Sequence, residues 1–189
     1  SDLTEAVSLT VAHSPYVRVD LEPFEWEEAM CVGIKRVARN RGRSNAGHYE
    51  RTHITTDYTA NCAGAVAERA VAKATNRYWT AGGAWAQAEH ADYRVLPDVS
   101  DGIEVRRIKD LNNQWFAIDE ITSASTVFAC YCEPPDYTTV RILGWATHEH
   151  ALAHAAKHIP TVNRLFAPLT ILTLQGLNGA VVEPLRAVA

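Results

Sequence analysis

The order of the helical and strand patterns is the feature that most constrains the fold of this chain. Two helices are expected first, at residues 25–40 and 59–79. The first has apolar residues at helical spacing, with acids in its first turn and bases in its last, which suits the helix dipole. The second is rich in alanine, so its backbone can approach a sheet closely. The expected strands, separated by turn residues, are 16–24, 93–96, 103–108, 114–118, 126–132 and 139–146.

A third helix is expected over residues 147–158, with Thr147 as its N-cap. Two helices, a run of strands and a final helix indicate an α/β or α+β domain, with a central mixed β-sheet of four to five strands flanked by helices. The whole chain, 1–189, is expected to form a single domain. Within it, residues 1–14 are expected to form an extended N-terminal arm, and residues 159–189 a C-terminal extension that docks on the main body.

The composition argues against several classes of protein. The formal net charge of −4 argues against a protein that coats nucleic acid nonspecifically, although clustered carboxylates are compatible with a metal-dependent nuclease. The longest apolar runs fall short of the roughly 20 residues that a membrane span needs, and no signal peptide is evident. The four cysteines have the spacing of neither a disulfide framework nor a zinc site, which favours a reducing, cytoplasmic setting.

The segment "LPDVSDGIEVRR", residues 96–107, combines an acidic turn with a charged strand. Residues two apart on a strand share a face, so Glu104 and Arg106 are expected to point the same way. Asp98 could return to that face across the turn, and two converging carboxylates would suit Mg²⁺. Arg106 would then hold a phosphate or stabilise its transition state. The alternative is a solvated turn followed by a surface ion pair, since this pattern is common by chance.

Glu68 is the second informative acid, because it lies in the middle of the alanine-rich helix. A charge on the face of this helix that meets the sheet would be costly unless it had a partner. Glu68 either completes a metal shell or orients its water, or it projects into solvent beside Arg69. The residues of the helix leave both interpretations open.

Three histidines, His150, His154 and His158, recur every four residues within the helix expected at 147–158. Two histidines at this spacing can chelate zinc or nickel, but no HExxH motif is present. We interpret the three as one solvated helix face with incidental chelating ability.

Four stretches of the chain, in a fixed order, carry a resemblance to a known family: "GAVAERAVAKATNRYW", "PDVSDGIEVRR", "YTTVRILGWAT" and "LFAPLTIL". They resemble small phage-encoded proteins of the PD-(D/E)XK nuclease superfamily. Those proteins commonly show a glycine–glutamate helix ending in a tyrosine–tryptophan pair, an aspartate–valine turn, a Q/E-V-R strand and a late glycine–tryptophan strand. The opening "VRVDLEPFEWEEAMCVGIKR" is similar to their first strand and helix, so the resemblance covers about residues 15–175.

The resemblance implies a restriction-endonuclease-like α/β core, in which the sheet carries catalytic acids and a preceding helix carries another. Asp98 matches the motif aspartate, Glu104 the (D/E) position and Glu68 the helix glutamate. On this resemblance, Asp98, Glu104 and Glu68 would hold Mg²⁺ or Mn²⁺.

Arg106 departs from the pattern, because the superfamily has lysine at this position. Arginine is always charged and can grip phosphate, but it cannot take part in proton transfer as lysine can. Three outcomes are open: arginine suffices for charge stabilisation, a lysine from elsewhere (Lys73 or Lys109) substitutes, or activity has been lost.

Our leading hypothesis is a metal-dependent nuclease-like phage protein that hydrolyses DNA phosphodiester bonds, with Glu68, Asp98, Glu104 and Arg106 as catalytic residues. Such a protein would act in the cytoplasm of the host cell and have DNA, not a membrane, as its partner. The alternative is a catalytically inactive nuclease-fold module, an accessory or virion-associated component that binds a phage or host protein. An unrelated α/β domain with an acidic surface turn is the third hypothesis.

Overall fold

The computed structural model describes residues 15–41, 54–81, 97–120, 122–159, 164–177 and 182–183. Its elements lie in the order β1 (Tyr16–Asp20), α1 (Pro23–Arg41), α2 (Ile54–Thr75), β2 (Ile103–Ile108), β3 (Trp115–Ile118), β4 (Thr126–Cys132), β5 (Thr139–Thr147), α3 (His148–Ala153), β6 (Lys157–Ile159), β7 (Arg164–Pro168), a 3₁₀ turn (Leu169–Ile171) and β8 (Val182–Glu183).

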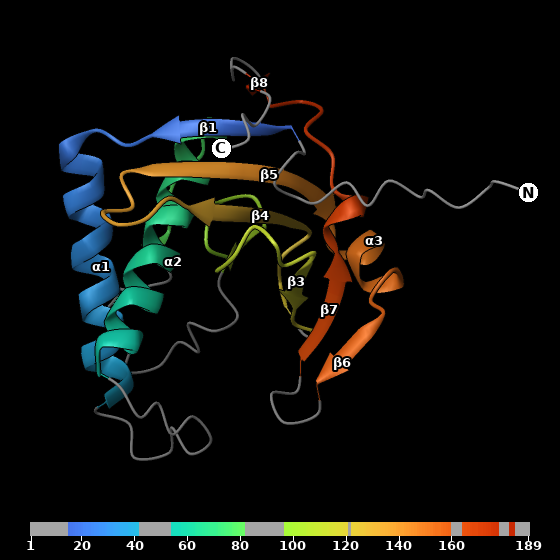
Figure 1. Ribbon diagram of the computed structural model, residues 1–189, viewed down its shortest axis with the longest axis horizontal. Coiled ribbons are helices and arrows are strands. Elements are labelled where there is room, and N and C mark those ends of the chain that lie inside the picture. Colours follow the sequence, from blue (N-terminus) through green and yellow to red (C-terminus); the bar gives the residue numbers. More distant parts are fainter. Residues whose placement is uncertain are drawn as a thin grey trace, which may run out of the picture.

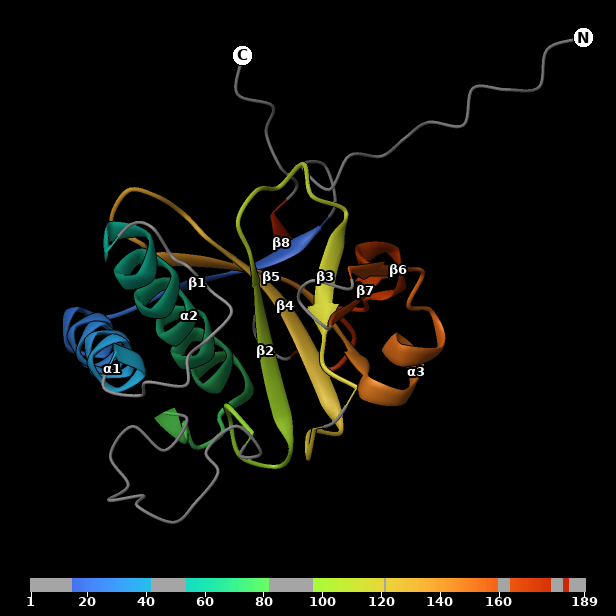
Figure 2. The ribbon, with the colours of Figure 1, turned by 90° about the horizontal axis from the view of Figure 1, so that it is seen from below.

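The elements form three layers (Figures 1 and 2). Helices α1 and α2 lie on one side of a five-stranded sheet with the order β2-β4-β5-β1-β8. A three-stranded sheet, β3-β7-β6, lies on the other side together with α3. In the five-stranded sheet β2 runs parallel to β4 and the remaining pairs are antiparallel, so the sheet is mixed. The protein is therefore a mixed α+β fold, and β2 is an edge strand.

Small residues let α1 and α2 pack closely against each other. A Cβ atom on Gly33 of α1 would lie 2.4 Å from the Cα atom of Cys62 in α2, closer than real side chains approach. The alanines and valines of α2 are buried against the five-stranded sheet, where they form the larger hydrophobic core with residues such as Val105, Cys130 and Ile142. The contact matches the alanine-rich pattern, because only small side chains allow a helix to lie this close to its neighbours.

A second core lies between the two sheets. It contains Phe116 and Ile118 of β3, Val127 of β4 and Ala167 of β7, all buried. Ile108 at the end of β2 also belongs to this core, whereas Val105 belongs to the first. The two faces of β2 are therefore covered by different layers.

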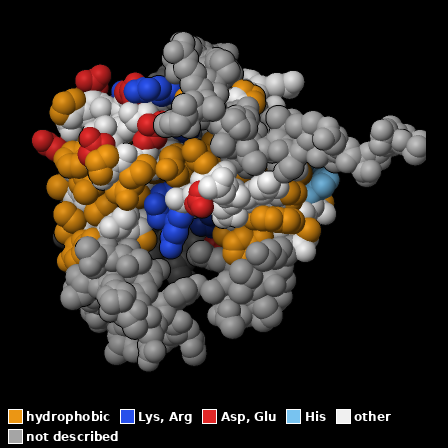
Figure 3. Space-filling view, viewed as in Figure 1, with side chains coloured by type: hydrophobic (Ala, Val, Ile, Leu, Met, Phe, Trp, Pro, Cys, Tyr) orange, Lys and Arg blue, Asp and Glu red, His pale blue; other side chains and the backbone are white. Residues whose placement is uncertain are grey.

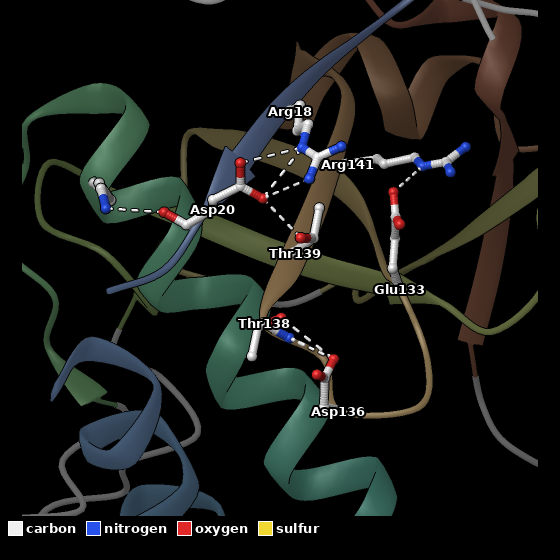
Figure 4. A network of polar contacts seen from close by, with 8 residues as sticks. Arg18, Asp20, Glu133, Asp136, Thr138, Thr139 and Arg141 are labelled. Atoms are coloured by element: carbon white, nitrogen blue, oxygen red, sulfur yellow. Dashed lines mark hydrogen bonds and ion pairs between the residues drawn. The ribbon is translucent and has the colours of Figure 1, made fainter. Parts of the chain in front are cut away.

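Polar contacts fasten β1 to its neighbours at its C-terminal end (Figure 4). The hydroxyl of Thr139 donates to the carboxylate of Asp20 at 2.7 Å, and Arg18 pairs with the same carboxylate. The ammonium of Lys73, near the end of α2, donates to the carbonyl of Asp20 at 2.9 Å and to the carboxylate of Glu25 at 2.7 Å. These contacts join the C-terminal end of β1 to β5, α1 and α2.

Most of the expected elements are confirmed. Strands 103–108 and 126–132 have the predicted bounds, and the strands near 16–24, 114–118 and 139–146 and the helix near 25–40 are also present. The expected arm 1–14 and strand 93–96, and most of the extension beyond 177, lie outside the described residues. In the described part of the extension β6 and β7 join β3, which therefore belongs to a separate sheet that the sequence did not predict.

Three helix ends differ from the prediction. Helix α2 begins at Ile54 and not at residue 59. Helix α2 ends at Thr75 and not near Trp79, because Asn76 adopts the left-handed conformation with φ 52° that asparagine tolerates at a helix end. Helix α3 begins as predicted, since the Thr147 hydroxyl accepts the N–H of His150, but it ends at Ala153. The helix predicted to reach 158 is therefore wrong in its second half, because residues 157–159 pair with β7 as strand β6. None of the helices in the described ranges is long and apolar enough to cross a membrane.

Candidate functional site

Glu68 points into the protein and not into solvent. It is 5% exposed, although it is charged and lies in the middle of α2. Its two carboxylate oxygens each accept one hydrogen bond from the guanidinium of Arg36 on α1, both at 2.7 Å. The indole N–H of Trp79 donates to Glu68 Oε2 at 3.1 Å. A buried charge needs such partners, and this set excludes the interpretation of Glu68 as a solvated residue.

The turn that carries Asp98 is fastened to the residues that follow α2. Ser100 N–H donates to the carbonyl of Tyr78 at 2.8 Å, and Thr80 N–H donates to the carbonyl of Asp98 at 3.2 Å. Trp79 forms an isolated β-bridge with Val99. The tryptophan that bonds to Glu68 is thus paired with the residue next to Asp98, and these contacts bring the acidic turn to the helix glutamate.

Asp98 lies at the edge of β2 that faces away from β4. Its Oδ2 atom accepts the backbone N–H of Val105 at 2.8 Å, and among the described residues no strand pairs with β2 on this side. Burial and the negative charge of Glu68 raise the pKa of Asp98 to about 8, against the smaller lowering effects of the Val105 N–H, Arg106 and Arg36. The folded environment therefore favours the protonated form of the Asp98 carboxyl group.

Glu104 and Arg106 share one face of β2, as predicted from their spacing. They form an ion pair in which both side chains are largely buried, and Arg106 also donates to Asp119 Oδ2 at 2.7 Å. Asp119 directly follows β3, so these two residues face the three-stranded sheet, whereas Val105 faces the helices. Among the described residues, Arg106 Nε is a buried donor without a hydrogen-bond partner.

The four predicted site residues therefore gather around one edge of β2 but do not converge on one point. Glu68 and Asp98 lie on the side of α2, within electrostatic range of each other and of Arg106. Glu104 stays with Arg106 on the opposite face. The part of the chain that the structure describes contains no group of three or more histidine, cysteine, aspartate or glutamate side chains placed to hold a metal ion together. Any cation at this edge would be held by the Asp98 and Glu68 carboxylates, a number that suits Mg²⁺, which keeps most of its waters.

Three neighbours of the site were not predicted: Arg36, Trp79 and Asp119. Arg36 lies in the second half of α1, and its partner Glu68 lies 32 positions away along the chain. Trp79 is a buried core residue that also donates to Glu68. Asp119 follows an expected strand without any local motif. Only the packing of α1 on α2 and of the two sheets shows these partners.

The other charged residues considered for the site have different contacts. Lys73, a candidate for the missing lysine, is bound to Asp20 and Glu25, and Lys109 is exposed beyond the end of β2. His150 and His154 lie with ring centroids 4.3 Å apart, but His158 belongs to β6, so the predicted face of three histidines does not form.

The surface is locally basic despite the negative net charge. Figure 3 shows Lys and Arg side chains gathered near the middle of one face, between the helical side and the side of the three-stranded sheet, with an acidic side chain beside them. A local surplus of positive charge of this kind can attract phosphate even when the whole chain is acidic.

Comparison of the chain with protein-family models, with curated proteins and with solved structures found no match.

Proposed function

We propose that this protein is a metal-dependent nuclease that hydrolyses DNA phosphodiester bonds at the edge of β2, on a restriction-endonuclease-like core. The observation that carries the proposal is the electrostatic coupling of two carboxylates, one on the turn and one on α2: the negative charge of the buried Glu68 helps to raise the pKa of Asp98. When both are ionised the two carboxylates repel one another, and a divalent cation bound by them would offset that repulsion.

The residues fit Mg²⁺ or Mn²⁺ through Asp98 and Glu68, with Glu104 outside the ligand set. When bound, the cation would polarise a phosphoryl oxygen and offset the charge that develops there. Glu68 would have to give up at least one of its two hydrogen bonds to Arg36, and this guanidinium would then be able to donate to the phosphate. Asp98 would lose its proton, so that cation binding should strengthen as the pH rises from 6 towards 8.

Arg106 would hold the phosphate. Its Nε donor is buried and unused among the described residues, and an unsatisfied buried donor costs about 1–3 kcal/mol. Because Nε is closed to solvent, a phosphate oxygen would reach it only if the Arg106 side chain moves towards the edge of β2 and gives up part of its pairing with Glu104 and Asp119. In this arrangement arginine supplies charge and hydrogen bonds, and no proton transfer is required of it.

Manganese binding by calorimetry and nicking of a supercoiled plasmid test this proposal. The wild type should bind Mn²⁺ and nick the plasmid only with Mg²⁺ or Mn²⁺ present, and Asp98→Asn and Glu68→Gln should lose both properties. Asp110→Asn is the matched control, since it removes an exposed carboxylate in the turn after β2. A folded wild type that neither binds Mn²⁺ nor nicks DNA would refute the proposal.

A second candidate function is a catalytically inactive module of the same fold that binds a phage or host protein. It is favoured by one observation: Glu68 and Glu104 are each already paired with an arginine, so that two of the three acids are neutralised within the chain. In this case Glu68→Gln should change stability alone, and the wild type should show no metal-dependent activity.

A further inference from the structure

A pocket of about 460 Å³ lies beside the acidic turn, where Asp101 is one of its lining residues. It is formed where the end of α2 meets the first residues of β2 and β4, the last residues of β5, and residues 175–177. Figure 2 shows α2 packed alongside the sheet whose β2, β4 and β5 lie side by side. The volume of the pocket falls within the roughly 300–1,000 Å³ that is typical of small-molecule sites.

One wall of the pocket is aromatic and is held rigidly. Phe128 of β4 and Trp145 of β5 are cross-strand partners, and their rings are stacked with centroids 6.5 Å apart. Phe128 is buried, while Trp145 is only half-buried. The indole N–H of Trp145 donates to the carbonyl of Gln175 at 2.9 Å, which fixes the orientation of the ring. A fixed, partly exposed aromatic ring is a stacking surface for another flat ring.

A glycine allows the C-terminal segment to complete this wall. Gly144 has φ +143°, and a Cβ atom there would lie 2.8 Å from the Cβ atom of Leu172 and 2.9 Å from the carbonyl oxygen of Thr173. Because that space is empty, residues 172–173 lie directly on β5, and Thr173 exchanges two backbone hydrogen bonds of 2.9 Å with Trp145. This pairing sets Gln175 at the pocket.

The rim of the pocket is polar and charged. Arg77 and Asp101 form an ion pair there whose side chains are 53% and 59% exposed, and Asn76 and Gln175 also line the pocket. Donors and acceptors around a flat apolar wall suit the hydrogen-bonding edge of a nucleobase better than an aliphatic ligand, which would leave them unpaired.

The position of the pocket links it to the proposed reaction site. Asp98 and Asp101 belong to the same turn, three residues apart, so their Cα atoms can be at most about 11 Å from each other. A nucleotide strand with a phosphate at Asp98 and Arg106 can therefore extend towards the pocket within one or two nucleotides. A base in an intact duplex is stacked and cannot enter a pocket, so the substrate must be single-stranded there or have one base turned out.

We propose that this pocket binds one unstacked nucleobase of the nucleic acid strand, next to the phosphate held at the edge of β2. The inference rests on the proposed function for its position along the strand. It makes Trp145 the stacking residue and the Arg77–Asp101 pair the polar rim that reads the edge of the base.

The probe is a set of single-stranded hexadeoxynucleotides, each with 2-aminopurine at one position, whose fluorescence falls when the base stacks. Binding is measured with EDTA present, so that cleavage does not interfere. We expect quenching at one preferred position with the wild type. Thr126→Phe, which fills the pocket from β4, and Trp145→Leu, which removes the stacking ring, should each weaken binding about tenfold or more.

The matched controls distinguish binding in the pocket from nonspecific attraction between DNA and positively charged side chains. Arg77→Ala should weaken binding, whereas Arg18→Ala, from an equally exposed Arg–Asp pair on β1, should not. Thermal melting verifies that each variant is folded, and Thr126→Phe adds a side chain without removing any core residue.

Three results would overturn the assignment: no quenching with the wild type, equal quenching with folded Thr126→Phe, or equally tight binding of the free 2-aminopurine nucleoside. The outcome is distinguishable from that of the proposed function. If the wild type nicks DNA but Thr126→Phe binds the oligonucleotide as tightly as the wild type does, the pocket assignment is refuted and the nuclease proposal stands. Pocket-dependent quenching without metal-dependent nicking refutes the nuclease and leaves the pocket.

Discussion

Replacing Asp98 with asparagine should make the protein more stable at high pH, although it removes a predicted catalytic residue. In the folded protein the pKa of Asp98 is raised from 3.8 to about 8. Each pKa unit corresponds to about 1.4 kcal/mol, so the ionised side chain disfavours folding by up to ~6 kcal/mol above pH 8. Asparagine carries no charge and its side-chain oxygen can still accept the Val105 N–H. The amide N–H groups of the asparagine have no hydrogen-bond acceptor at this position among the described residues, which lowers the free energy of unfolding by about 1–3 kcal/mol.

The sign of the effect depends on pH. A raised pKa means that the folded state holds the Asp98 proton more tightly than the unfolded state does. The contribution of this group to the free energy of unfolding of the wild type is therefore fully present below pH 4 and is lost as the pH rises to about 8. Asp98→Asn should therefore be equally or less stable than the wild type at pH 4. At pH 8.5 it should be more stable by ~3–5 kcal/mol, the ~6 kcal/mol of the charge less the cost of the amide group, with most of the change between these pH values.

Urea unfolding at pH 4, 6, 7 and 8.5, in buffers with EDTA, measures this difference. Asp110→Asn, which removes an exposed carboxylate, should stay within about 0.5 kcal/mol of the wild type throughout. A stability difference for Asp98→Asn that does not change with pH would refute the reasoning, because it would mean that Glu68 and burial do not act on this carboxyl group.

Two further predictions concern packing and thiol chemistry. Gly33→Ala should destabilise the protein by ~1–3 kcal/mol or more in urea unfolding, because the new Cβ atom would lie 2.4 Å from the Cα atom of Cys62. Gly64→Ala should instead stabilise α2 by about 0.5–1 kcal/mol, because nothing lies within 4 Å of the new Cβ atom. Equal effects of the two substitutions would contradict the close contact of α1 with α2. With a thiol reagent at pH 8, Cys31 alone should react quickly in the folded protein, because burial raises the pKa values of the other three cysteines. A second fast-reacting thiol would show that this burial is incomplete.

The sequence by itself determined the local elements and the partners that lie close along the chain. The alternating strands 103–108 and 126–132 and the amphipathic helix near 25–40 were predictable, because periodicity follows from backbone geometry within a few residues. The shared face of Glu104 and Arg106 followed in the same way from their spacing of two. The cap at Thr147 was equally local.

Only the tertiary structure decided which acids meet and what neutralises them. The bidentate pair of Arg36 with Glu68 depends on how α1 packs on α2, and the position of Asp98 depends on the bridge between Trp79 and Val99. The separation of β3 into a second sheet depends on β7, nearly fifty positions later, whose strand pattern carries no sign of its partner. Residues far apart in sequence find each other through the burial of apolar surface, which is not directional. The chemistry of the edge of β2 is therefore a property of the packed layers and not of any one segment.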